Sequence, residues 1–503
     1  MSFLTNLLQI MKLFSQLRYD IPSGIIVFFV ALPLCLGIAL ASGAPLFSGI
    51  ISGVVGGIVV GALSGSALGV SGPAAGLVTI VLANIATLSS WDSFLLVVVI
   101  AGFIQLIMGY AKLGTIAYYF PSSVIKGMLV GIGLTIIIKQ VPHILGYNFE
   151  SIKDLDFKLL APGAILITIT SLALLIFWEK FLTNKHKIFK VIPAPLAVVI
   201  LGIIFFNLFY YEILPFSLKQ RHLVEIPVAK NLSDFFGYFQ FPDFSQIKNP
   251  EIYTMAIILA VVASLETLLS TEACDKLDPQ KRLTPANREL KAQGIGNIIS
   301  GLIGGLPITQ VIVRSSANVS FGARTKLSTI IHGITLLIAV ISIPKLLNMI
   351  PLASLSCVLL VIGYKLANPK IFKQMYELGF EQFFPFVITV LAMLTFDLLK
   401  GIAFGMVMAI FYLIINNYRN PFRRLKHKEE SSNEYVYKLA EETSFLNRGS
   451  ILQMLTEIPE GSKLIIDGRG SKFIHHDVIE ILKDFKISAK AKNISFILKG
   501  IKF

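Results

Sequence analysis

The 503-residue chain is 54% hydrophobic and only 15% charged, a composition that excludes an ordinary soluble globular protein and is typical of a polytopic membrane protein. Its net charge of +14 does not indicate nucleic-acid binding, because the basic residues fall between hydrophobic runs, as the positive-inside rule describes. Three widely separated cysteines, Cys35, Cys274 and Cys357, predict neither a disulfide framework nor a metal site.

The chain opens with residues 1–20, which we interpret as a cytosolic amphipathic lead-in, because no small-residue cleavage site follows their apolar stretch. From Ile21 to near Asn416, apolar runs recur at lengths that cross or partly cross a bilayer core of about 30 Å. We predict about fourteen segments, some too short to cross alone, near residues 22–41, 46–65, 73–88, 93–111, 121–140, 161–179, 192–209, 252–272, 290–304, 308–320, 327–345, 350–364, 382–398 and 401–417.

Lysine and arginine collect after the even-numbered segments, at residue 112 and within 185–190, 276–291, 324–326, 365–373 and 419–428. The positive-inside rule places these loops and both termini in the cytosol, and the long loop 210–250, with its balanced charge, outside. We therefore expect a multi-pass protein of the inner (plasma) membrane, with a first membrane repeat at 21–209 and a second at 251–420.

After Pro421 the apolar segments stop, and residues 430–503 show the rhythm of a small soluble α/β unit. Short apolar runs alternate there with helical stretches, as YVYKLA, SILQMLTEI, KLIIDG, DVIEILKDF and ISFILKG. The segment is short for an independent domain.

Two matching stretches suggest internal symmetry. LSGSALGVSGPAAGLVTIVLANI places Pro73 before a short apolar run, and ISGLIGGLPITQVIVRSSANVS places Pro307 before another, about 234 residues later. Paired broken helices of this kind are typical of inverted-repeat transporters, whose helix starts offer free N–H groups and a positive dipole end to an anion. The alternative is that these Gly and Pro residues serve only close helix packing. The substrate-binding residues predicted at the two starts are Ser71, Gly72, Ala74 and Thr79, and Thr309, Gln310, Val311 and Arg314.

Several stretches resemble the sulfate permease (SulP) family of anion transporters, in order along nearly the whole membrane part: SGPAAGLVTIVLA, PSSVIKGMLVGIGLTIIIKQ, IPAPLAVVILG, NRELKAQGIGNIISGLIGGLPITQVIVRSSANVSFGARTKLS and TFDLLKGIAFGMVMA. The resemblance implies an α-helical polytopic membrane protein of fourteen transmembrane segments, built as two inverted seven-segment repeats with core and gate domains. It also implies a small cytosolic α/β STAS domain, short and degenerate here, and a homodimer.

One carboxylate, Glu266, lies inside the apolar run IILAVVASLETLLS, on the same predicted helix face as Ser270. An ionisable group within a membrane span is costly and is a functional candidate by default, although a helix-packing carboxylate is the alternative. The resemblance implies that Glu266 and Ser270 serve coupling to H⁺ or Na⁺, and no other cofactor or metal is expected.

Arg314 lies seven residues past Pro307, so we expect it about two turns into its helix. The resemblance implies that it lines the anion pathway, and an ion pair with Glu266 is the alternative. Sodium-coupled bicarbonate members have a hydroxyl residue where this chain has Ile312, which favours protons as the coupling ion.

In the soluble segment, His475 and His476 replace the family's aspartate-serine pair, so control by phosphorylation is not expected there.

These patterns predict a secondary-active transporter of small inorganic anions, bicarbonate or sulfate, working by elevator-type alternating access. The open alternatives are an uncoupled channel or exchanger, a dicarboxylate or nucleobase transporter, and a sensor centred on the STAS segment. No nucleophile, base and orienting group converge, so no enzyme is expected. The expected partners are the anion, the lipid bilayer and a second copy of the chain, without nucleic acid.

Overall fold

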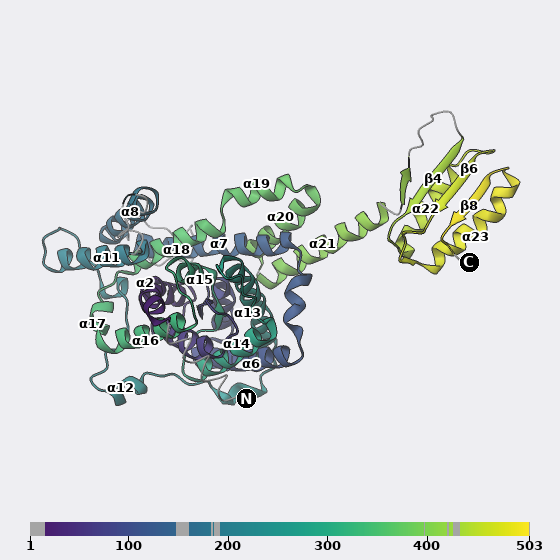
Figure 1. The fold of residues 1–503 in the computed structure, drawn as a ribbon. Helices are drawn as coiled ribbons and strands as arrows, with labels where there is room; N and C mark the ends of the chain where they lie inside the picture. The colour runs from purple at the N-terminus through teal and green to yellow at the C-terminus, as the bar shows by residue number, and fades with distance from the viewer. Residues whose placement is uncertain are drawn as a thin grey trace. The chain divides into compact units, whose positions relative to one another are not determined.

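The computed structural model describes residues 16–146, 160–182, 185, 192–396, 398–419, 422–425 and 433–501, so most of the expected lead-in lies outside the described residues. The chain divides into two compact units. The first reaches to Glu377 and includes Phe386–Ala403, and the second comprises Leu378–Pro385 and Phe404–Phe503. Figure 1 labels several helices and strands of both.

Helices build the first unit. Its first half contains α2 (Leu17–Ala41), α3 (Leu46–Val55), η1 (Gly56–Val60), α4 (Gly61–Leu63), η2 (Ala75–Leu77), α5 (Val78–Leu88), α6 (Trp91–Tyr110), η3 (Leu113–Tyr119), α7 (Ser122–Leu145), α8 (Pro162–Phe177), η6 (Trp178–Leu182) and α11 (Ala194–Tyr210). A connecting loop carries η7 (Gln220–His222), α12 (Leu232–Gly237) and η8 (Phe244–Lys248).

The later elements repeat this helical pattern. They are α13 (Pro250–Leu277), α14 (Ala286–Leu302), α15 (Ile312–Ser320), α16 (Leu327–Ser342), α17 (Pro344–Leu347), α18 (Leu352–Leu366), α19 (Pro369–Glu377), α20 (Phe380–Thr395) and α21 (Leu398–Arg419).

The described helices confirm a polytopic helical membrane protein. Seven of them are long and apolar enough to cross a bilayer, and several shorter apolar helices accompany these. The fourteen predicted segments coincide with observed helices to within a few residues, with two exceptions. The segments at 73–88 and 308–320 each begin with extended backbone, and their helices start a few residues later.

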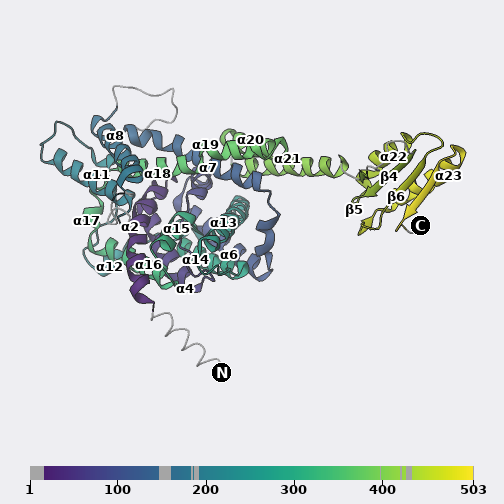
Figure 2. The ribbon, with the colours of Figure 1, turned by 45° about the horizontal axis from the view of Figure 1, so that its top comes forward.

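The helices of the first unit pack as two groups, seen in Figures 1 and 2. In one group α6 packs on α13 and α14, and α2 packs on α3, α15 and α16; in the other α7, α8 and α11 pack with α18. The two groups meet where α2 also packs on α11 and α18. Glycines allow the closest approaches, since a Cβ added at Gly102 would lie 2.7 Å from the Gly294 carbonyl oxygen, and one at Gly133 would lie 2.5 Å from that of Gly363.

A two-stranded sheet lies inside the first group. Strand β1 (Ser71–Pro73) pairs antiparallel with β2 (Ile308–Gln310), with Ser71 opposite Gln310 and Pro73 opposite Ile308. Antiparallel pairing of matching segments from the two halves is the arrangement that an inverted repeat produces.

The strands correct the prediction for both helix starts. Ser71, Thr309 and Gln310 lie in strands and not in a first helical turn, because pairing β1 with β2 satisfies backbone groups that no water reaches at this depth. Helix α15 begins only at Ile312, so Arg314 lies in its first turn and not two turns along.

In the second unit, a four-stranded sheet has the order β3-β4-β6-β8. Besides the start of α20 and most of α21, the unit contains β3 (Phe422–Leu425), β4 (Glu434–Leu439), β5 (Glu442–Thr443), η9 (Phe445–Asn447), α22 (Arg448–Thr456), β6 (Lys463–Asp467), β7 (Phe473–Ile474), α23 (His476–Ala491) and β8 (Ser495–Lys499). The sheet thus begins before residue 430. Strands β4, β6 and β8 run parallel, and α22 and α23 bury Leu464, Ile466 and Leu482 against them, as the alternating pattern predicted.

One of the two adjacent histidines has a structural role. His475 is the N-cap of α23, and its Nδ1 accepts a hydrogen bond from the Asp477 backbone N–H at 3.3 Å.

Candidate functional site

The β1–β2 pair is held from several sides by buried polar contacts. The Val311 N–H donates to the Val70 carbonyl oxygen at 3.0 Å, and the Val70 N–H donates to Ser315 Oγ of α15 at 3.0 Å. Gln293 of α14 donates from Nε2 to Ser71 Oγ at 2.8 Å. These bonds fix the backbone that leads into α5 and α15.

Arg314 is the largest fully buried side chain near these strands, with 1% of its surface exposed. Its Nη2 lies 3.5 Å from the Pro73 carbonyl oxygen, and Nε and Nη1 have no hydrogen-bond partner among the described residues. A Cβ at Gly72 would lie 2.1 Å from Nη1, so the guanidinium lies directly against β1. Since a buried cation with unpaired N–H groups is costly, this arrangement favours an anionic ligand.

Two further polar side chains lie within electrostatic range of Arg314. They are Cys35 of α2 and His332 of α16, both fully buried. Neither ring nitrogen of His332 has a partner in the described part of the chain. Sequence reasoning missed His332, although a histidine inside an apolar segment is itself a signal.

Glu266 reaches the other helix start. Its Oε1 accepts a hydrogen bond from the Gly76 N–H at 3.3 Å, and its buried Oε2 has no partner within the described ranges. A Cβ at Gly76 would lie 2.5 Å from Oε2, so the carboxylate lies over the first turn of η2, which leads into α5. No ion pair joins Glu266 to Arg314, both of which are described, so that alternative is not supported.

Helix α13 contacts β2 through two threonines that sequence reasoning missed. The Gln310 N–H donates to Thr267 Oγ1 at 3.3 Å. The Thr271 hydroxyl has two acceptors for its one proton, Gln310 Oε1 at 3.0 Å and the Thr267 carbonyl oxygen at 2.7 Å. The spacing of four residues between the two threonines places them on one helix face, but it does not indicate that this face, and not that of Glu266 and Ser270, meets β2. Ser270 is also buried, but no hydrogen bond from it to another described site residue is found.

The remaining predicted residues lie in β2 or at the two helix starts. Ala74 and Val311 are the extended residues that precede η2 and α15. The hydroxyls of Thr79, at the start of α5, and of Thr309, in β2, are buried and have no hydrogen-bond partner among the described residues. The structure therefore gathers the predicted substrate residues around two helix starts, with unpaired donors from Thr79, Thr309 and Arg314.

A second buried carboxylate, that of Glu289, is linked to β1 through hydrogen bonds. Glu289 of α14 accepts hydrogen bonds from Ser64 Oγ and from Gln293 Nε2, the latter at 2.9 Å. Because the same Gln293 nitrogen contacts Ser71, this network fixes β1, and sequence reasoning did not identify it.

Removing the Thr271 hydroxyl tests the contact between α13 and β2. We expect Thr271→Val to raise, about 2- to 12-fold, the KM for the anion whose transport the family resemblance implies, because a net hydrogen bond contributes about 0.5–1.5 kcal/mol. Initial uptake rates over a range of anion concentrations measure this. Thr254→Val, at an exposed position of the same helix, is the matched control, and an equal KM in both variants would remove Gln310 from the site.

A methyl group at Gly56 tests the position of β1. A Cβ there would lie 2.5 Å from the Ser71 carbonyl oxygen, so Gly56→Ala must displace the strand. We expect the variant to lose about 1–3 kcal/mol of stability and most of its uptake. Gly237→Ala, where nothing lies within 4 Å of the added Cβ, should behave as wild type in melting and uptake. Wild-type uptake by Gly56→Ala would show that transport does not need β1 in this position.

Comparison with known proteins places the chain among membrane transporters. Residues 17–410 match the model of the Sulfate permease family. YvdB of Bacillus subtilis (strain 168), whose name describes a sulfate transporter, is 27% identical over 407 residues, covering 79% of this chain and 74% of YvdB.

The bicarbonate transporter BicA of Picosynechococcus sp. is 27% identical over 382 residues, covering 73% of this chain and 64% of BicA. The structure of the murine anion transporter Slc26a9 in its inward-facing state has a TM-score of 0.77 at 16% identity, covering 97% of this chain and 86% of the murine chain. This last similarity supports the fold, including the C-terminal α/β unit.

Proposed function

Because the chain belongs to the sulfate permease family, we propose that it carries a small inorganic anion, bicarbonate or sulfate, across the plasma membrane. The names of YvdB and BicA, which describe a sulfate and a bicarbonate transporter, support this choice of substrates. The α/β unit fits the STAS domain that the resemblance implies, and the protein acts as a carrier and not as an enzyme.

One observation supports the proposal most strongly, namely the buried Arg314 with unpaired Nε and Nη1 against the β1–β2 pair. An oxyanion accepts hydrogen bonds from a guanidinium with favourable geometry. The start of α15 adds the positive end of a helix dipole, and the hydroxyls of Thr79 and Thr309 add donors. The anion would therefore lie between the starts of α5 and α15.

Glu266 supplies the coupling in this proposal. Its carboxylate accepts the hydrogen bond of the Gly76 N–H at the start of η2. The carboxylate therefore competes with the anion for this donor, and its negative charge repels the anion. Uptake of a proton, or binding of Na⁺, neutralises the carboxylate and permits the anion to bind. The cation and the anion then cross together, and release of the cation restores the repulsion.

The two helix groups suggest which parts move during transport. We place the anion site on the group that contains α2, α13 and α15, and this group moves as an elevator against the group of α7, α8, α11 and α18. The charge pattern of the loops supports cytosolic termini and an outward loop 210–250, and the family resemblance supports a homodimer.

Uptake into proteoliposomes tests the function. Labelled bicarbonate, sulfate and a dicarboxylate are offered in turn, each with an imposed pH gradient, an imposed Na⁺ gradient, or neither. Gradient-driven accumulation of bicarbonate or sulfate is the expected result, with the pH gradient as the effective one. Flux that follows only the anion's own gradient would instead identify an uncoupled channel or exchanger, and preference for the dicarboxylate would reject the inorganic anion.

A further inference from the structure

A cavity of about 270 Å³ is lined by none of the residues of the candidate site. Its walls come from the end of α2, the end of α7, the first turns of α8 and α18, and η7 in the connecting loop. The lining includes Leu40, His143, Leu218, Arg221, His222 and Leu352, and none of the residues assigned to anion transport contributes to it.

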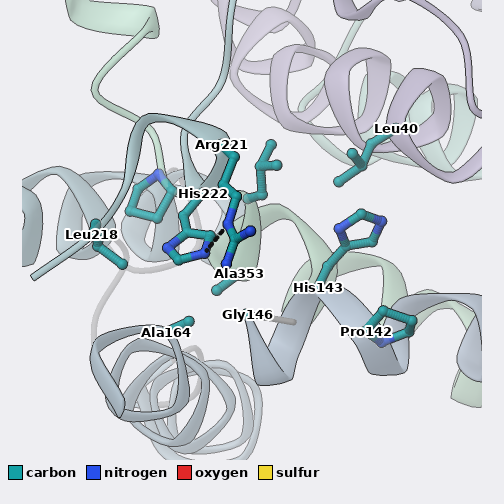
Figure 3. Close-up of a pocket in the computed structure, with 11 residues that line it drawn as sticks. Leu40, Pro142, His143, Gly146, Ala164, Leu218, Arg221, His222 and Ala353 are labelled. Atoms are coloured by element: carbon teal, nitrogen blue, oxygen red, sulfur yellow. Dashed lines mark hydrogen bonds between the residues drawn. The ribbon is translucent and has the colours of Figure 1, made fainter. Parts of the chain in front are cut away.

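Basic groups converge on this cavity. Figure 3 shows the Arg221 guanidinium between the rings of His222 and His143. Arg221 Nε lies 3.3 Å from His222 Nε2, and no carboxylate of the described residues forms an ion pair with Arg221. Burial and the adjacent Arg221 charge lower the pKa of His222, so near neutral pH the fixed positive charge of the cavity belongs to Arg221.

The rest of the lining is apolar. Leu40, Leu218 and Leu352 face the same space, together with Pro142, Pro351 and two alanines. A small inorganic oxyanion could pair with Arg221, but it would leave this apolar wall in contact with water. Organic ligand sites combine a mostly apolar lining with a few placed polar groups, which is the composition found here.

We propose that this cavity binds a small organic monocarboxylate, with its carboxylate on Arg221 and its apolar body against Leu40, Leu218 and Leu352. The guanidinium offers the paired N–H groups that a carboxylate accepts. The first turns of α8 and α18 add positive helix ends to the same cavity. The bound molecule would join α2 of one helix group to α7, α8 and α18 of the other.

Equilibrium binding of labelled benzoate to the purified full-length protein in detergent tests this site without requiring transport. We expect saturable binding to the wild type, at least ten-fold weaker binding to Arg221→Gln, and unchanged binding to Lys230→Gln, an exposed cation of the same loop outside the lining. Acetate, which has the carboxylate without the ring, should displace benzoate only at ten-fold or higher concentration.

Four results would overturn the proposal. The first is the lack of saturable benzoate binding by the wild type, and the second is equal binding by the wild type and Arg221→Gln. The third is displacement of benzoate by sulfate or acetate as effectively as by benzoate itself, which would assign the cavity to anions in general. Loss of binding in Arg314→Gln with retention in Arg221→Gln would place benzoate at the transport site instead.

Discussion

Replacing Glu266 by glutamine is expected to abolish gradient-driven accumulation of the anion while leaving anion exchange close to the wild-type rate. The amide has nearly the same volume and is permanently neutral, so the repulsion that links anion binding to cation binding is lost. The anion can then bind and cross without a cation. Accumulation should fall to the level set by the anion's own gradient.

Two assays on the same proteoliposomes separate these effects. Net uptake under a pH or Na⁺ gradient reports coupling, and exchange of labelled for unlabelled anion reports binding and movement. Glu251→Gln, at an exposed position in the first turn of the same helix, is the control and should retain both. If Glu266→Gln still accumulates the anion against its gradient, Glu266 is a packing carboxylate and the coupling group lies elsewhere.

Replacing Arg314 by glutamine has the second large expected effect, a loss of about 10- to 150-fold in apparent affinity for the anion. Hydrogen bonds that involve a charged group contribute about 1.5–3 kcal/mol, and the guanidinium is the only cationic side chain that the described site residues supply. Thermal stability should not fall in parallel, because a buried cation with unpaired N–H groups costs energy that the amide avoids.

Uptake kinetics and melting of the detergent-solubilised protein check both statements. Arg448→Gln, an exposed arginine on α22, serves as the control for removal of a positive charge. An Arg314→Gln variant that melts well below wild type and keeps its KM would make Arg314 a structural residue of α15.

Much of the fold was predictable, because hydropathy determines which segments leave water. The apolar runs located the helices to within a few residues, and the glycines and prolines before the two short runs, at Gly72 and Pro73 and at Gly304, Gly305 and Pro307, located the broken segments. Hydropathy does not encode which backbone groups pair, however. The β1–β2 sheet was therefore missed, since each strand is too short to show an alternating pattern.

For the candidate site, the sequence indicated residues that the structure brings together, but not the contacts among them. Glu266 and Arg314 stood out because charged residues are rare in apolar segments. The sequence could not show that Glu266 reaches Gly76 and not Arg314, because that depends on how α13 crosses the half-helices. Thr267 and Thr271 were passed over in favour of Ser270, since periodicity alone does not indicate which face of α13 meets β2.

The position of the bound anion is the most direct test of the whole account. Crystals of the protein grown with selenate, an analogue of sulfate, can be measured at the selenium absorption edge to locate the anion by anomalous scattering. The account predicts one peak within hydrogen-bonding distance of Arg314, between the starts of α5 and α15, that disappears in Arg314→Gln. A peak bound elsewhere along the transport path, with none beside Arg314, would contradict it.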